Sequence, residues 1–74
     1  MTISYEAIEF ETASEAIQHT DASGRGVAIR VRGQAMVVDQ NDAYRLEAAG
    51  AEFAYLHDHE MPDGSYRIVT VPVN

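Results

Sequence analysis

The residues of this chain best suited to chemistry are four consecutive ones, His57, Asp58, His59 and Glu60. They fall in a segment with the pattern of a β-strand, where residues two apart point to the same side, so His57 and His59 project together. Two neighbouring imidazoles can ligate one metal ion, but zinc and iron sites use further ligands. His57 and His59 are therefore a candidate metal pair that needs His19 or a distant carboxylate to complete it.

The same cluster lacks the partners of a catalytic site. Histidine titrates near neutrality and a carboxylate beside it could tune it. The chain, however, has no cysteine and no GxSxG nucleophile motif. The simpler interpretation is that both histidines are half-exposed strand residues near a turn, with His57 beside Tyr55. We therefore predict no catalytic residue and no cofactor, which favours a non-catalytic protein over an enzyme.

Arg30 and Arg32 form the second candidate site, a cationic patch in an acidic protein. Alternation along a strand places both on one face. They could pair across strands with Glu9 and Glu11. Alternatively, they could bind an acidic partner peptide. The loop 24–26, Gly-Arg-Gly, lacks the full phosphate-loop pattern and is interpreted as a connector.

Charge and hydropathy exclude several classes of partner. Twelve acidic residues against five basic ones give a formal net charge of -7, which disfavours binding to nucleic acid or anionic membranes. No apolar run approaches the about 20 residues that cross a bilayer. The first ten residues show no signal-peptide pattern. We predict a cytoplasmic protein with no nucleic-acid or membrane partner.

The length predicts one domain, residues 1–74, with a thin core. A chain this short buries only about 60 % of the surface that its unfolded form exposes. Without cysteine, neither disulfides nor a Cys-based zinc site can staple the fold. Self-association is another source of stability, so we predict a homodimer.

The first part of the chain predicts a strand, a short helix and a loop. Residues 3–11 alternate apolar and polar side chains, with one phase slip near Ala7 that indicates a bulge or a late start. Thr12 to Glu15 fit a capping box. The helix that follows is expected to be short because residues 20–26 are rich in turn formers.

The middle of the chain predicts a hairpin followed by the main helix. Residues 27–38 alternate around a turn at Arg32 and Gly33. Asp39 suits a helix N-cap and Gly50 a left-handed terminator, so the main helix spans about residues 40–49 and buries a stripe centred on Leu46. The expected core face of the hairpin consists of Val27, Ile29, Val31, Met36 and Val38.

The last hairpin joins strands at residues 52–60 and 65–73 through Met61–Gly64, whose Pro, Asp and Gly are typical turn formers. Two registers are open. Pairing Met61 with Ser65 places His57 and His59 on the same face as Arg67. Pairing Glu60 with Ser65 instead places Asp58 opposite Arg67.

These elements predict a small α+β fold, in the order strand, short helix, strand, strand, helix, strand, strand. Its main helix packs on a mostly antiparallel sheet, with a ββαββ core over residues 27–73. A ferredoxin-like arrangement is the alternative.

No combination of motifs identifies a family. The composition and the strand edges favour a module that acts by protein association, through a sheet edge or through Arg30 and Arg32. One alternative is a metal-binding protein or small metal-dependent enzyme using His57 and His59. The other is an acidic inhibitor that mimics a nucleic acid.

Overall fold

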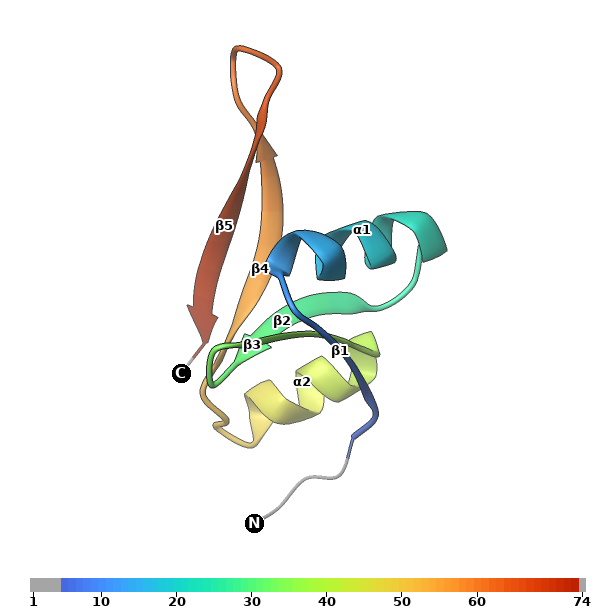
Figure 1. The fold of residues 1–74 in the computed structure, drawn as a ribbon. Coiled ribbons are helices and arrows are strands. Elements are labelled where there is room, and N and C mark those ends of the chain that lie inside the picture. The colour runs from blue at the N-terminus through green and yellow to red at the C-terminus, as the bar shows by residue number, and fades with distance from the viewer. Residues whose placement is uncertain (1–4, 74) are drawn as a thin grey trace.

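The computed structural model describes residues 5–73, which form a five-stranded antiparallel sheet with one helix on each face (Figure 1). The strand order is β1-β3-β2-β4-β5. The predicted α+β class and element order are confirmed. In chain order, the elements are β1 (Ala7–Phe10), α1 (Ala13–Ser23), β2 (Val27–Val31), β3 (Gln34–Val38), α2 (Gln40–Ala48), β4 (Phe53–Glu60) and β5 (Tyr66–Val73).

The N-terminal strand and helix follow the local signals of the sequence, except in the length of the helix. Residues 3 and 4 of the predicted strand lie outside the described part of the chain, and among the described residues β1 starts at Ala7, which agrees with a late start. At the start of α1, the Thr12 hydroxyl accepts from the Glu15 N–H at 3.2 Å, which confirms the N-cap half of the capping box. The Glu15 carboxylate reaches back as expected, but it accepts from the Thr12 hydroxyl at 3.0 Å. The prediction of a short helix is wrong, because α1 runs for 11 residues to Ser23. Its end is set by Gly24, in the left-handed conformation at φ 67°, and not by the turn formers before it.

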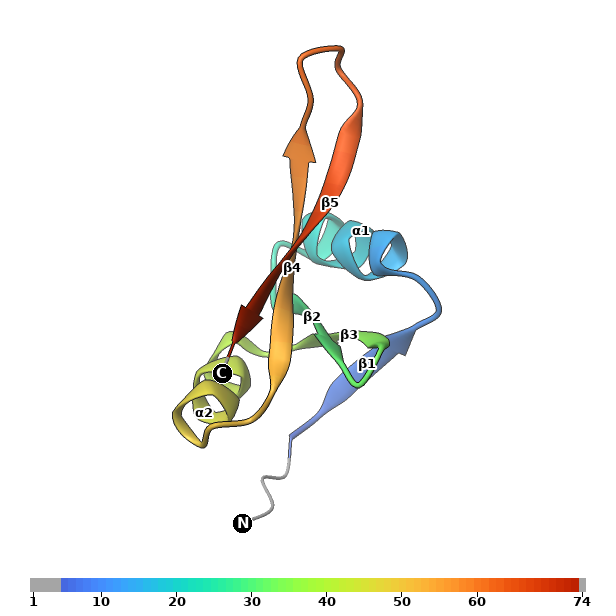
Figure 2. The ribbon, with the colours of Figure 1, turned by 90° about the vertical axis from the view of Figure 1, so that its left-hand side faces the viewer.

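The two helices lie on opposite faces of the sheet because both crossovers run the same way across it (Figure 2). The chain moves from β1 past β3 to β2 through α1, and then from β3 past β2 to β4 through α2. The second crossover starts from an antiparallel strand, so the same handedness brings its helix to the other face. The ferredoxin-like alternative is therefore wrong: there β4 would pair with β1 and both helices would cover one face.

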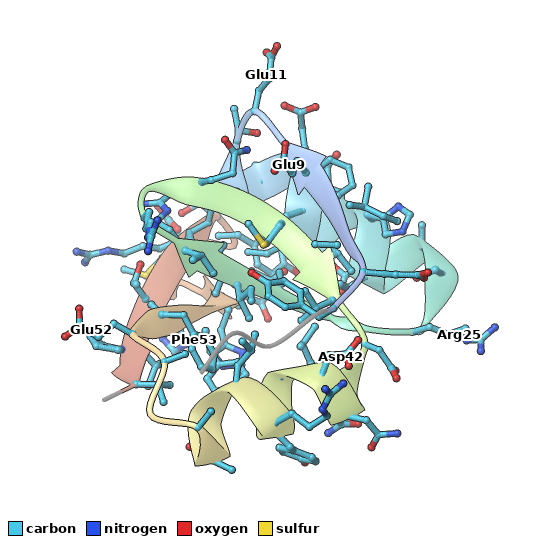
Figure 3. The ribbon with its side chains drawn as sticks, turned by 90° about the horizontal axis from the view of Figure 1, so that it is seen from below. Glu9, Glu11, Arg25, Asp42, Glu52 and Phe53 are labelled. Carbon is cyan, nitrogen blue, oxygen red and sulfur yellow. The ribbon has the colours of Figure 1, made fainter. Side chains whose placement is uncertain are left out.

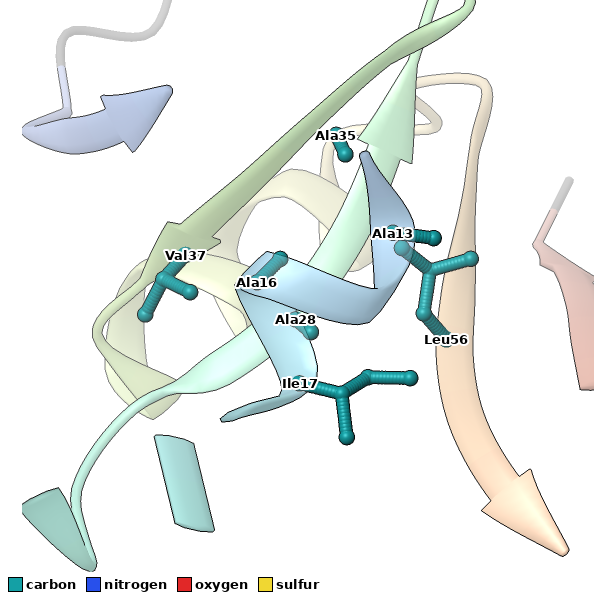
Figure 4. Close-up of a cluster of buried hydrophobic side chains, with 7 residues drawn as sticks. All are labelled: Ala13, Ala16, Ile17, Ala28, Ala35, Val37 and Leu56. Atoms are coloured by element: carbon teal, nitrogen blue, oxygen red, sulfur yellow. The ribbon is translucent and has the colours of Figure 1, made fainter. Parts of the chain in front are cut away.

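The core has two layers, one under each helix. Alternate residues of β2 and β3 supply them, so the face that holds Ala28, Ala35 and Val37 is also buried. The expectation of one core face was incomplete for that reason. The layer under α1 contains Ala13, Ala16, Ile17, Ala28, Ala35, Val37 and Leu56 (Figure 4). The layer under α2 contains Ile29, Met36, Val38, Ala43, Leu46 and Phe53.

Helix α2 begins and ends where the sequence indicated, with one difference in its cap. The N–H of Gly50 donates to the Glu47 carbonyl at 3.1 Å and that of Ala51 to the Leu46 carbonyl at 3.0 Å, which is a Schellman end. Asp39 occupies the N-cap position but its side chain makes no capping hydrogen bond. We therefore expect Asp39→Ala to cost less than the about 1 kcal/mol of a bonded cap. No helix within residues 5–73 has the length and apolar character needed to cross a membrane.

Candidate functional site

The most distinctive surface of the molecule is the hairpin formed by β4 and β5. Its register pairs His59 with Arg67 and His57 with Val69, which selects the first of the two registers open from sequence. The turn fixes this register. The Gly64 N–H donates to the Met61 carbonyl at 2.9 Å, and the Met61 N–H donates to the Ser65 carbonyl at 2.7 Å. Gly64, at φ 88°, occupies the left-handed bulge position of this three-residue loop.

Asp63 holds the same turn together. One carboxylate oxygen accepts from the Ser65 hydroxyl at 2.6 Å and from the Ser65 N–H at 3.0 Å. These two hydrogen bonds lower the pKa of Asp63 below its ordinary value, and the bond from the Ser65 hydroxyl has the larger effect. The tip of the hairpin is therefore a defined structure even though its residues are exposed.

Among residues 5–73, the hairpin is anchored to the rest of the protein at its base. Phe53 and Leu56 are 6 % and 4 % exposed, one in each core layer. β2 pairs with β4 at Ala54 and Tyr55. The hairpin extends past α1 and accounts for much of the long 45 Å dimension of the molecule (Figures 1 and 2). Within residues 5–73, its outer part, residues 57–60 and 62–70, is exposed on both faces.

The outer edge of β5 carries unpaired backbone groups. In an antiparallel ladder, hydrogen-bonded pairs alternate with pairs whose N–H and C=O groups point outward. The bond between Met61 and Ser65 places His59–Arg67 and His57–Val69 among the bonded pairs. By the same alternation Val71 and Val73 also face β4, and the residues between these turn their backbone groups to the free edge. These are Tyr66, Ile68, Thr70 and Pro72.

This edge lacks most of the features that protect natural sheet edges. Such edges are commonly short, bulged, covered, or marked by charged residues and proline. β5 is eight residues long and its register runs without a bulge. Arg67 is its one charged residue, and Pro72 interrupts the outward N–H groups only near the end of the strand.

Apolar side chains flank the edge on both faces of the hairpin. Ile68 is 39 % exposed, on the face that α1 covers further down. Val69 and Val71 are 40 % and 45 % exposed, on the α2 face. β5 contains no carboxylate in a protein whose net charge is -7. The combination of open backbone groups, apolar side chains and little charge suits contact with another strand.

His57 and His59 lie side by side on the exposed part of β4, as predicted. The ring of His57 stacks on Tyr55, with centroids 6.4 Å apart. His59 is opposite Arg67, whose positive charge opposes a bound cation. Throughout residues 5–73, no group of three His, Cys, Asp or Glu side chains is arranged to hold a metal ion. His19 of α1, the suggested third ligand, packs against Phe10 of β1, with ring centroids 5.4 Å apart.

Arg30 and Arg32 do not share one strand face. Arg30 lies in β2 opposite Ala35, and Arg32 is a turn residue with φ 51° beside Gly33 at φ 81°. Glu9 is opposite Met36, which is on the other face of the sheet from Arg30. The predicted pairing of Arg30 with Glu9 is therefore not formed. Both arginines are exposed, and their role in partner binding stays a prediction.

Several carboxylates lie at separate places on the surface. Figure 3 shows Glu9 and Glu11 at one side of the molecule and Glu52 at another, each pointing away from the sheet. Asp42 is held by Arg45 at 3.0 Å. These four carboxylates are not aligned as the charges of a phosphate backbone are, and the acidic-mimic hypothesis stays a prediction.

No protein-family model, curated protein or solved structure matches this chain.

Proposed function

We propose that this chain is a non-catalytic module that works by protein–protein association, and that it self-associates through the free edge of β5. The observation that carries the proposal is the open edge between Tyr66 and Thr70. Strand addition at such an edge pairs backbone groups that are otherwise left to water. It would also cover part of the exposed side chains of Ile68, Val69 and Val71.

The size of the chain supports the same proposal. Its two core layers are thin, and small residues make up much of the layer under α1. A second copy on β5 would bury apolar surface that the chain cannot bury alone. A contact along one strand edge is small compared with a standard interface, so we expect a dimer of modest affinity.

The other two hypotheses have weaker support. A metal site built on His57 and His59 has a cationic neighbour, Arg67, and no third ligand within the described part of the chain. A nucleic-acid mimic would need aligned carboxylates. The strand edge, by contrast, is a complete binding element by itself.

Thr70→Pro tests the proposal, because it blocks the outward side of β5 while leaving the bonds to β4 in place. Thr70 lies opposite Leu56 in a pair that turns its N–H outward, so proline there removes no hydrogen bond within the hairpin. The matched control is Thr70→Val, which keeps the N–H. The masses of the three proteins are measured by sedimentation and light scattering over a concentration series.

We expect the wild type and Thr70→Val to form dimers as the concentration rises, and Thr70→Pro to remain a single 8.1 kDa chain. The circular dichroism of Thr70→Pro verifies that it is folded. A wild type that stays monomeric at the highest concentration overturns the proposal. If Thr70→Pro dimerises as tightly as the wild type, the contact lies elsewhere on the molecule.

A further inference from the structure

We infer that the partner strand is β5 of a second copy, paired antiparallel with Ile68 on a two-fold axis. This inference rests on the proposed self-association and adds its geometry. A two-fold axis normal to the sheet reverses the strand direction and keeps the two faces continuous, as a homodimer contact requires. The result is one ten-stranded sheet made from two five-stranded ones.

The outward backbone groups of β5 are symmetric about Ile68. With that residue on the axis, Ile68 pairs with its own counterpart. Tyr66 of each copy pairs with Thr70 of the other, which makes three pairs in all. Each of these three pairs can make two hydrogen bonds, because every residue involved has a free N–H and a free C=O. All outward N–H groups of the edge from Tyr66 to Thr70 are then used.

Pro72 selects this register over its neighbour. Moving the axis to Val69 would place Pro72 opposite Tyr66 of the second copy. Proline has no N–H there, so the Tyr66 carbonyl would lose its donor, and the ring would push the strands apart. With Ile68 on the axis, Pro72 falls beyond the last bonded pair. The proline thus limits the paired length without weakening it.

The side chains fit the same register. On the α1 face, Ile68 meets its counterpart at the axis, and Tyr66 lies beside Thr70 of the second copy. On the α2 face, Arg67 lies opposite Val69, where its aliphatic stem can cover the valine while its charge stays in water. No carboxylate lies on either paired strand, which keeps the acidic groups of the two copies apart.

Single cysteines test the register cleanly, since the natural chain contains none. In the proposed pairing, the two Cα atoms of residue 68 lie about 5.5 Å apart, within the range of a disulfide. Those of residue 69 are diagonal neighbours at about 7–8 Å, which is beyond it. Ile68→Cys and Val69→Cys are therefore matched variants at adjacent positions of similar exposure.

Under mild oxidation, we expect Ile68→Cys to form a covalent dimer and Val69→Cys to remain unlinked. Adding Thr70→Pro to Ile68→Cys should abolish the link. Because Ile68→Cys could itself weaken the pair, a mixture of isotope-labelled and unlabelled wild type gives a second readout, an intermolecular NOE between the two Ile68 side chains.

The outcomes separate this inference from the proposed function. A wild-type dimer that links through Val69→Cys and not through Ile68→Cys overturns the register and leaves self-association standing. A wild-type dimer with no link at either position and no Ile68 NOE overturns the edge pairing. A wild type that is monomeric at every concentration overturns both.

Discussion

Replacing Gly26 by alanine tests a close approach between the loop after α1 and the end of β3. A Cβ atom at this position would lie 2.9 Å from Cγ1 of Val37 and 3.0 Å from the Val38 carbonyl oxygen. Gly26 also has a φ of 81°, which side chains disfavour. The left-handed conformation costs about 1–2 kcal/mol. Crowding in a packed region adds about 1–3 kcal/mol. We therefore expect Gly26→Ala to lower the free energy of unfolding by about 2–5 kcal/mol.

Gly24 provides the matched control in the same loop. Its φ is 67°, but a Cβ there would meet nothing within 4 Å. Gly24→Ala should therefore cost only the conformational term, about 1–2 kcal/mol. Urea unfolding followed by circular dichroism, at concentrations below dimer formation, measures both losses. A third protein, Gly26→Ala with Val37→Ala, removes one of the two contacts and should show favourable coupling.

The two glycines separate crowding from conformational strain. If Gly24→Ala and Gly26→Ala lower the free energy of unfolding equally, the close approach of Gly26 to β3 is refuted. The absence of coupling with Val37→Ala would show that the side-chain contact contributes nothing. A larger loss in Gly26→Ala than in Gly24→Ala, together with a double variant that loses less than the sum of its two substitutions, supports the packing described.

Three further predictions concern charge. The low pKa of Asp63 gives the turn a stabilisation that is present above pH ~4 and lost as the pH falls through the folded-state value. Asp63→Asn should flatten this pH dependence of the turn's stability, and the amide resonance of Ser65 in NMR spectra measures it. Burial first, and then the Glu47 carboxylate, raise the pKa of Tyr55 above its ordinary 10.0. Stability should thus be full below pH 10 and fall as the pH rises through the folded-state value. Glu47→Gln should lower that pKa in a spectrophotometric titration, and an unchanged pKa would exclude the contribution of Glu47. Finally, each copy carries a net charge of -7, so added salt should strengthen the proposed dimer by screening repulsion. Sedimentation showing weaker association in salt would instead indicate attraction between opposite charges.

Local signals in the sequence predicted the parts of the fold that are determined locally. The N-cap at Thr12, the turn at Arg32 and Gly33, and the left-handed end at Gly50 were each confirmed. Every one of these features depends on residues within five positions of each other along the chain. Their conformations follow from side-chain hydrogen bonding and from the freedom of glycine.

Long-range order was not accessible in the same way. The pairing of β4 with β2 depends on which side of the sheet the second crossover takes, and no local pattern encodes that choice. The length of α1 was underestimated because its buried residues Ala16 and Ile17 outweigh the turn propensity of residues 20–23. The separation of Arg30 from Glu9 follows from strand register across three strands.

The candidate site was predicted only in part. The sequence indicated strand edges as contact surfaces, which stays a prediction. It also placed His57 and His59 on one face, and the register of β4 and β5 confirms that placement. It did not indicate that β5 would be the open edge, since strand order decides this. Ile68 and Thr70 were missed for the same reason. The signal available was the run 66–71, which contains no carboxylate, no lysine and no proline.

Amide hydrogen exchange along β5 tests most directly the claim that a second copy covers this edge. Within one chain, the N–H groups of Arg67, Val69 and Val71 face β4 and are protected, whereas those of Ile68 and Thr70 face outward. The proposed pairing predicts that exchange at Ile68 and Thr70 slows as the protein concentration rises, while the inward amides change little. Exchange at Ile68 and Thr70 that stays fast and independent of concentration would contradict it.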